Sequence, residues 1–109
     1  MQHQEIKLSK LDTEDVKLII TAIEHYYNQM LLDYSNNKLN LSLLQTLYLK
    51  VQKLHFNFYK QQVFSLKLLY HYAITMQQSL SIYHNQTKDQ FFKNRALQLI
   101  YKLDTQIKK

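Results

Sequence analysis

Hydrophobic side chains recur along this chain at intervals of three and four residues, the spacing that places them on one face of a helix. In the first such segment the face consists of Val16, Ile19, Ile23, Tyr26 and Met30. Three later segments repeat the pattern, with apolar positions between residues 44 and 58, 66 and 83, and 92 and 103. The pattern predicts four amphipathic helices that bury one face each.

Polar residues typical of helix ends separate these segments. Residues 12–15 begin with an N-cap candidate, Asp12, and continue with acids that favour the positive end of a helix. Asn40 or Ser42 can cap a second helix, and residues 87–90 form a capping-box pattern before the fourth. The caps and faces together predict helices at roughly 12–34, 41–56, 62–84 and 88–107.

The predicted fold class is all-α, an antiparallel up-down four-helix bundle that forms a single domain over residues 1–109. Residues 1–11 show no clean period and are interpreted as a frayed arm or a short extra turn. No strong helix breaker interrupts residues 55–59, so the alternative is three helices, with the second and third continuous. We expect a turn at residues 57–62 instead, because a helix of more than about 40 residues is unusual in a small domain.

Composition supports the helical prediction and removes several kinds of site. The chain has no glycine, proline or cysteine. Glycine and proline dominate tight turns, so a β-rich domain would be hard to build from this sequence. Phosphate-binding glycine loops and the nucleophile elbow both need glycine, and a thiolate nucleophile or a cysteine-ligated zinc needs cysteine. No cofactor is expected.

The titratable residues do not form a pattern that indicates catalysis. Neither His-x₃-His nor His-Glu-x-x-His spacing occurs, and His25 and Glu24 are adjacent, so they point in different directions on a helix. The eight acids are explained by capping and by the solvated side of the first helix. We therefore predict no catalytic residues, no metal site and no enzyme activity.

Charge is distributed unevenly along the chain. Residues 1–34 contain six acids and three lysines, whereas residues 35–109 contain two acids and eleven lysines or arginines. Lys50, Lys53 and Lys60 share one face of the second predicted helix, opposite its apolar face. Such a basic face can bind nucleic acid, which makes a nucleic-acid-binding accessory protein the alternative function, although the solvated face of an ordinary helix is the favoured explanation.

The first predicted helix has more apolar residues than one packed face requires. Leu18, Leu31 and Leu32 lie outside its main apolar face, and a helix apolar on two sides is either central or covered by a partner. These three leucines are the interface candidates. The predicted function is a non-enzymatic protein–protein interaction module that self-associates, with a homodimer as the expected state.

A competing explanation keeps the protein monomeric, because Ile6, Leu8 and Leu11 of the N-terminal arm could cover those leucines.

The longest uncharged run is interrupted by polar residues, so no membrane span is expected and the predicted location is cytoplasmic.

Overall fold

The structure, a computed structural model, describes residues 5–57 and 63–108. Helices account for 78% of it, so the prediction of a mostly helical chain is confirmed. The elements in chain order are β1 (Glu5–Leu11), α1 (Thr13–Leu31), the short 3₁₀ helix η1 (Tyr34–Asn36), α2 (Lys38–Asn57), β2 (Phe64–Leu69), α3 (Tyr70–Gln86) and α4 (Gln90–Ile107).

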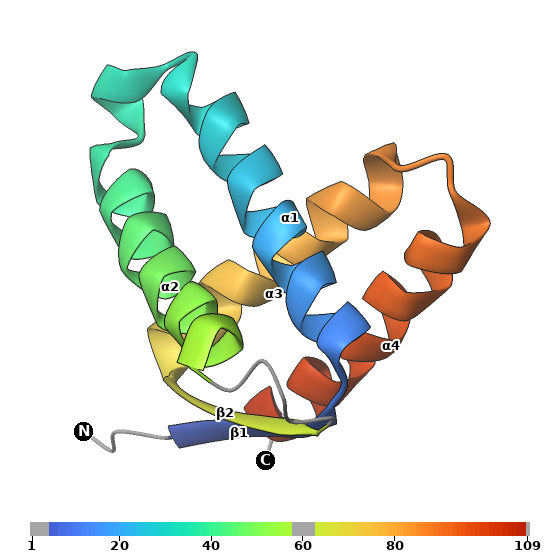
Figure 1. Cartoon of the computed structure of the whole chain (residues 1–109). Coiled ribbons are helices and arrows are strands. Elements are labelled where there is room, and N and C mark those ends of the chain that lie inside the picture. The colour runs from blue at the N-terminus through green and yellow to red at the C-terminus, as the bar shows by residue number, and fades with distance from the viewer. Residues whose placement is uncertain (1–4, 58–62, 109) are drawn as a thin grey trace.

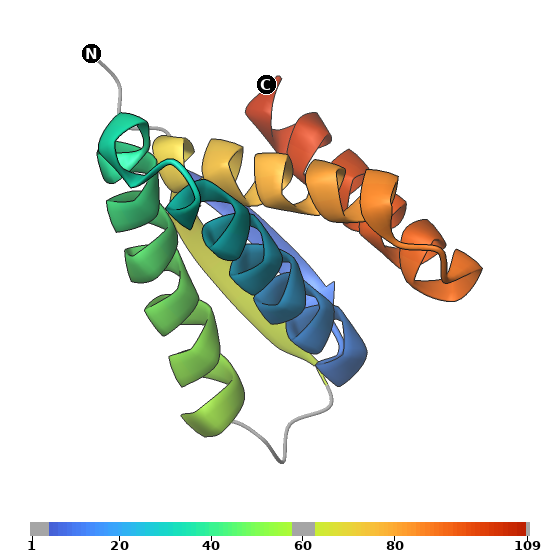
Figure 2. The same cartoon turned by 90° about the horizontal axis from the view of Figure 1, so that it is seen from above.

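The helices form two antiparallel hairpins, α1–α2 and α3–α4, which diverge from each other above a two-stranded sheet (Figure 1). Seen from above, the hairpins fan out while the strands run beneath α1 (Figure 2). Helix α3 packs against both α1 and α2 as well as α4, and α1 contacts the other three helices and β1. The helices thus alternate in direction along the chain, but the two hairpins splay apart.

The prediction of a chain without strands is wrong. Strand β1 pairs antiparallel with β2, in a register that sets Ile6 opposite Leu68 and Leu8 opposite Leu66. Both strands alternate buried and exposed positions, so one face of the sheet packs on the helices and the other faces water. The N-terminal arm is therefore a strand over residues 5–11.

The third helix begins at Tyr70, eight residues later than predicted, because residues 64–69 form β2. The same strand excludes a continuous second and third helix. Leu66 and Leu69 have helical spacing by coincidence: Leu66 is buried in the sheet, and Leu69 is 45% exposed. Residues 58–62, which include part of the predicted turn and Phe58, lie outside the described residues.

The caps explain where α1 and α4 begin. The predicted cap of α1 is confirmed: the Asp15 amide donates to the Asp12 side chain at 2.8 Å, and the Asp12 amide donates to Asp15 at 3.1 Å. At α4 the cap is Asp89 rather than Thr87, since Asp89 Oδ1 accepts from the Phe91 amide at 2.9 Å.

The α1–α2 turn has the predicted length of six residues but lies three residues earlier in the chain, so the helix boundaries differ from the prediction. Helix α1 ends at Leu31 instead of residue 34, and α2 begins at Lys38, ahead of the predicted caps Asn40 and Ser42. The turn between them contains η1 and is held by Asn37, whose side-chain amide donates to the carbonyl oxygens of Asp33 and Met30. No helix in the described ranges is long and apolar enough to cross a membrane.

The core lies where both hairpins meet the inner face of the sheet. Its fully buried side chains come from every helix and from both strands; the largest are Phe64, Ile6, Leu8, Leu11, Ile19, Ile23, Leu44, Leu47, Leu68, Met76, Leu80 and Leu99. Most of the predicted helix faces are inside it, including Val51 of α2 and Leu103 of α4. The ends of both hairpins extend beyond this core (Figure 1).

Candidate interaction surfaces

The three leucines that the sequence singled out separate into two groups. Leu18 is only 3% exposed and belongs to the core beside β1 residues. It is therefore not on any free surface, because Ile6, Leu8 and Leu11 join it in the same cluster, as the competing explanation supposed. The other two remain outside that cluster, since Leu31 is 43% and Leu32 is 89% exposed.

Leu31 and Leu32 lie at the end of the α1–α2 hairpin, and two further apolar side chains join them in that segment. Tyr34 of η1 is 58% exposed and Leu39 of α2 is 74% exposed. We call these four residues (Leu31, Leu32, Tyr34 and Leu39) the hairpin tip. The interface candidates chosen from the sequence did not include Tyr34 and Leu39. Leu39 could have been identified, because it lies between the first two predicted helices, where an apolar side chain has no predicted helix face to join.

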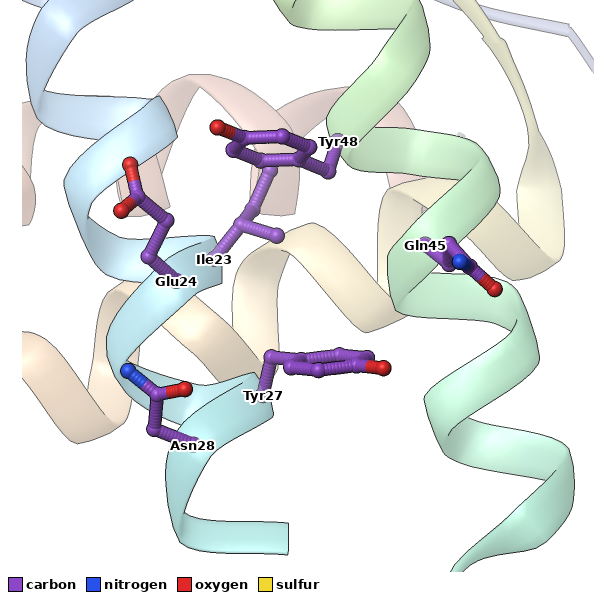
Figure 3. Close-up of a pocket in the computed structure, with 6 residues that line it drawn as sticks. All are labelled: Ile23, Glu24, Tyr27, Asn28, Gln45 and Tyr48. Carbon is purple, nitrogen blue, oxygen red and sulfur yellow. The ribbon is translucent and has the colours of Figure 1, made fainter. Parts of the chain in front are cut away.

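A cleft of about 250 Å³ opens between α1 and α2, below the hairpin tip. The Tyr27 ring reaches from α1 toward α2 and the Tyr48 ring reaches back toward α1, with Ile23 behind them (Figure 3). Glu24 and Asn28 line the α1 side of the opening, and Gln45 lines the α2 side. Within the described chain the Glu24 carboxylate makes no ion pair, so the cleft offers two phenol rings and one negative charge.

Tyr27 links this cleft to the hairpin tip. It precedes Leu31 by four residues on α1, so the two side chains lie on the same side of the helix, one turn apart. Both rings that flank the cleft are half-buried, which leaves part of each available for contact. The cleft and the tip therefore form one continuous stretch along the α1–α2 hairpin.

Two of the three predicted basic-face residues are described. Lys50 and Lys53 are exposed on α2, and neither makes an ion pair with any described residue. Lys60 lies outside the described residues. The structure thus places Lys50 and Lys53 on a solvated helix face.

The principal charged cluster joins α4 to the start of α1. Arg95 Nη1 donates to Asp12 Oδ1 at 2.7 Å and to Asp15 Oδ1 at 2.8 Å, and Nη2 donates to Asp12 Oδ2 at 3.0 Å. These hydrogen bonds hold the pKa of Asp12 at about 2, below its ordinary 3.8, and the two carboxylates raise the pKa of Arg95. Because each carboxylate also caps α1, the cluster is a structural link between helices.

His25 also connects two helices, α1 and α3. His25 Nε2 on α1 donates to Gln86 Oε1 at the end of α3, and Gln29 Nε2 donates to the same oxygen at 3.0 Å. The Tyr83 ring meets His25 edge-on, with ring centroids 6.4 Å apart. In the described part of the chain no three His, Asp or Glu side chains converge in a way that could hold a metal ion.

Comparison with known proteins gives no relative from which a role could be transferred. No family model, no curated protein and no solved structure matches this chain.

Proposed function

We propose that this protein is a non-enzymatic interaction module that self-associates through the end of its α1–α2 hairpin. The observation that carries the proposal is the hairpin tip, where four large apolar side chains gather within nine residues of sequence. Leu32 and Leu39, the most exposed of them, are 89% and 74% accessible. Burying a leucine fully is worth about 1.5–3 kcal/mol, so contact at this tip would contribute several kcal/mol to association.

The charges around the tip favour a second copy of the chain as the partner. Asp33 and Lys38 lie between the apolar residues in the sequence, and the Lys38 ammonium lies 5.8 Å from the centre of the Tyr34 ring. A surface that carries both signs beside an apolar centre can meet itself across a two-fold axis, since each acid can then approach a lysine of the other copy. A two-fold dimer is also the commonest assembly of small proteins.

The cleft extends the contact along the hairpin. Its tyrosine rings are rigid and amphipathic, the type of side chain enriched at the centres of protein interfaces. Tyr27 lies on the same side of α1 as Leu31, so a partner seated on the tip can also insert a side chain between Tyr27 and Tyr48. This arrangement gives the interface an apolar contact at the tip and a recessed contact in the cleft below it.

Sedimentation equilibrium at tens of micromolar tests the proposal. Wild-type protein is expected at twice the 13.2 kDa chain mass. Changing both Leu32→Gln and Leu39→Gln should weaken the dimer at least tenfold, since the substituted side chains are solvent-exposed and their loss leaves the core intact. Leu49→Gln is the matched control: Leu49 is 59% exposed on α2 but outside the tip, so its dimer should be unchanged.

A wild-type species of 13.2 kDa over this concentration range would contradict self-association. A dimer that survives the double substitution but is lost in Leu49→Gln would place the interface on another part of α2 and contradict the tip as its site.

A further inference from the structure

The solvent-facing side of the sheet carries lysines where the strand pair itself would be more stable without them. Lys7 of β1 is directly opposite Lys67 of β2 in the register, and both are exposed. Like charges at directly opposed positions of an antiparallel pair repel each other and destabilise it. An acid or a hydroxyl at either position would avoid this repulsion.

A second unfavourable feature lies three residues further along β1. Between the Leu8–Leu66 and Leu11–Phe64 pairs, β1 has two residues, Ser9 and Lys10, where β2 has one. Lys10 adopts a left-handed conformation, with φ 58°. This region is unfavourable for a residue other than glycine, asparagine or aspartate, and such strain is concentrated at functional sites. The bulge leaves both Ser9 and Lys10 facing solvent.

These residues line one side of a pocket of about 300 Å³, and the C-terminal half of α4 forms the other side. Helix α4 packs against β1 at this point, near the C-terminus (Figure 1). The lining residues are Lys7, Leu8, Ser9, Lys10, Lys102, Thr105 and Gln106. Three lysines therefore line one opening.

Within the described chain none of Lys7, Lys10 and Lys102 has an ion-pair partner. Asp104, two residues after Lys102 on α4, is already paired with Lys108 at 2.9 Å, and that contact lowers its pKa. The only other acid on these two elements is Glu5, at the far end of β1.

We infer that the pocket between β1 and α4 binds a phosphate group, which the ammonium groups of Lys7, Lys10 and Lys102 hold. Three separate point-charge donors suit an anion with several acceptor oxygens, and lysine is a common phosphate ligand. The Ser9 hydroxyl, which has no partner among the described residues, is a further donor. A bound phosphate neutralises part of the charge on Lys7, and so reduces the repulsion between Lys7 and Lys67.

The phosphate could belong to a small molecule or to a nucleic-acid backbone. Lys67, beside Lys7 but outside the pocket lining, extends the basic surface across both strands. That extension favours a chain of phosphates over a single one, since adjacent backbone phosphates need adjacent cations. The site is distinct from the hairpin tip, so the inference does not depend on self-association.

Thermal unfolding in sodium phosphate, compared with sodium chloride at equal ionic strength, tests the pocket directly. Wild-type protein should unfold at a higher temperature in phosphate, because a ligand that binds only the folded state stabilises it. The variant with Lys7→Gln, Lys10→Gln and Lys102→Gln should lose this shift. It should also be at least as stable as the wild type without phosphate, because the repulsion is relieved.

The matched control replaces three exposed lysines elsewhere, with Lys50→Gln, Lys53→Gln and Lys88→Gln. It has the same net charge as the pocket variant and should keep the phosphate shift. If the pocket variant does not fold, Lys102→Gln alone, on an exposed position of α4, should still reduce phosphate affinity at least threefold.

A fluorescent single-stranded oligonucleotide distinguishes the two sources of phosphate. If the backbone is the ligand, affinity exceeds that of inorganic phosphate and falls steeply with salt. The pocket variant should then lower the slope of log affinity against log salt by about 2, at about 0.7 for each lost contact. Equal affinity for the oligonucleotide and inorganic phosphate would assign the pocket to a small phosphorylated molecule.

Two results would overturn the inference. One is an equal rise of the unfolding temperature in phosphate for the wild type and the pocket variant. The other is that polyglutamate binds as tightly as the oligonucleotide, with the same dependence on the three lysines. The first would show that phosphate acts elsewhere, and the second that the surface attracts any polyanion.

Discussion

Arg95 joins α4 to the N-terminus of α1 through three hydrogen bonds to Asp12 and Asp15. Arg95→Met is expected to lower the free energy of unfolding by about 1.5 kcal/mol, measured by urea denaturation. This is the lower end for hydrogen bonds to charged groups, because Arg95 and Asp12 both remain partly exposed to water. Lys17→Met is the control: its ion pair with Glu14 is long, 3.8 Å, and exposed, so the loss should stay below about 0.5 kcal/mol.

The same substitution should change how stability depends on pH. The pKa of Asp12 falls from 3.8 to about 2 on folding, so its ionised form stabilises the folded state above about pH 4. That contribution declines as pH falls from about 4 to 2, where the folded-state carboxyl also takes up a proton. In Arg95→Met the decline over this range should be shallower. Parallel curves for the two proteins would show that Arg95 does not set the pKa of Asp12.

At the scale of elements, β1 decides how α1 is covered. Ile6 is fully buried and lies opposite Leu68 in the sheet. Ile6→Ala should therefore destabilise the protein by about 2–5 kcal/mol in urea unfolding, because it leaves a cavity between the sheet and the helices. Glu5→Ala, at the exposed neighbouring position, should change stability by less than about 0.5 kcal/mol. Equal, small effects would mean that the N-terminal segment is a frayed arm in solution.

At the scale of the whole molecule, small residues allow the two hairpins to meet. Ala22 of α1, Ala73 of α3 and Ala96 of α4 are all fully buried, and these are the only alanines in the chain. Because α3 packs against both α1 and α4, a larger side chain on its buried side would force the helices apart. Ala73→Leu is expected to cost about 1–3 kcal/mol in unfolding free energy. Gln78→Leu, exposed on the same helix, should be close to neutral; a similar loss there would point to a general effect of leucine in α3.

The candidate surfaces could be identified from the sequence only in part. Leu31 and Leu32 were identifiable because they lie beyond the packed face of α1, and they are exposed. Leu18 has the same kind of position on a helical wheel, yet β1 covers it, and a wheel carries no information about a segment distant in sequence. Lys7 and Lys102 are 95 positions apart and line the same pocket only because α4 packs on β1.

The sequence by itself determined the four helices, the cap of α1 and most of the buried helix faces, because caps and periodicity act over a few residues. It also contained the alternation of residues 5–8 and 64–68, a period-two signal that the longer helical repeats overshadowed. Tertiary structure alone decided that these two segments pair, how the hairpins splay and which leucines stay exposed. A strand pair gains its stability from hydrogen bonds and packing with a partner, here more than 50 residues away, so neither segment specifies the sheet by local preference.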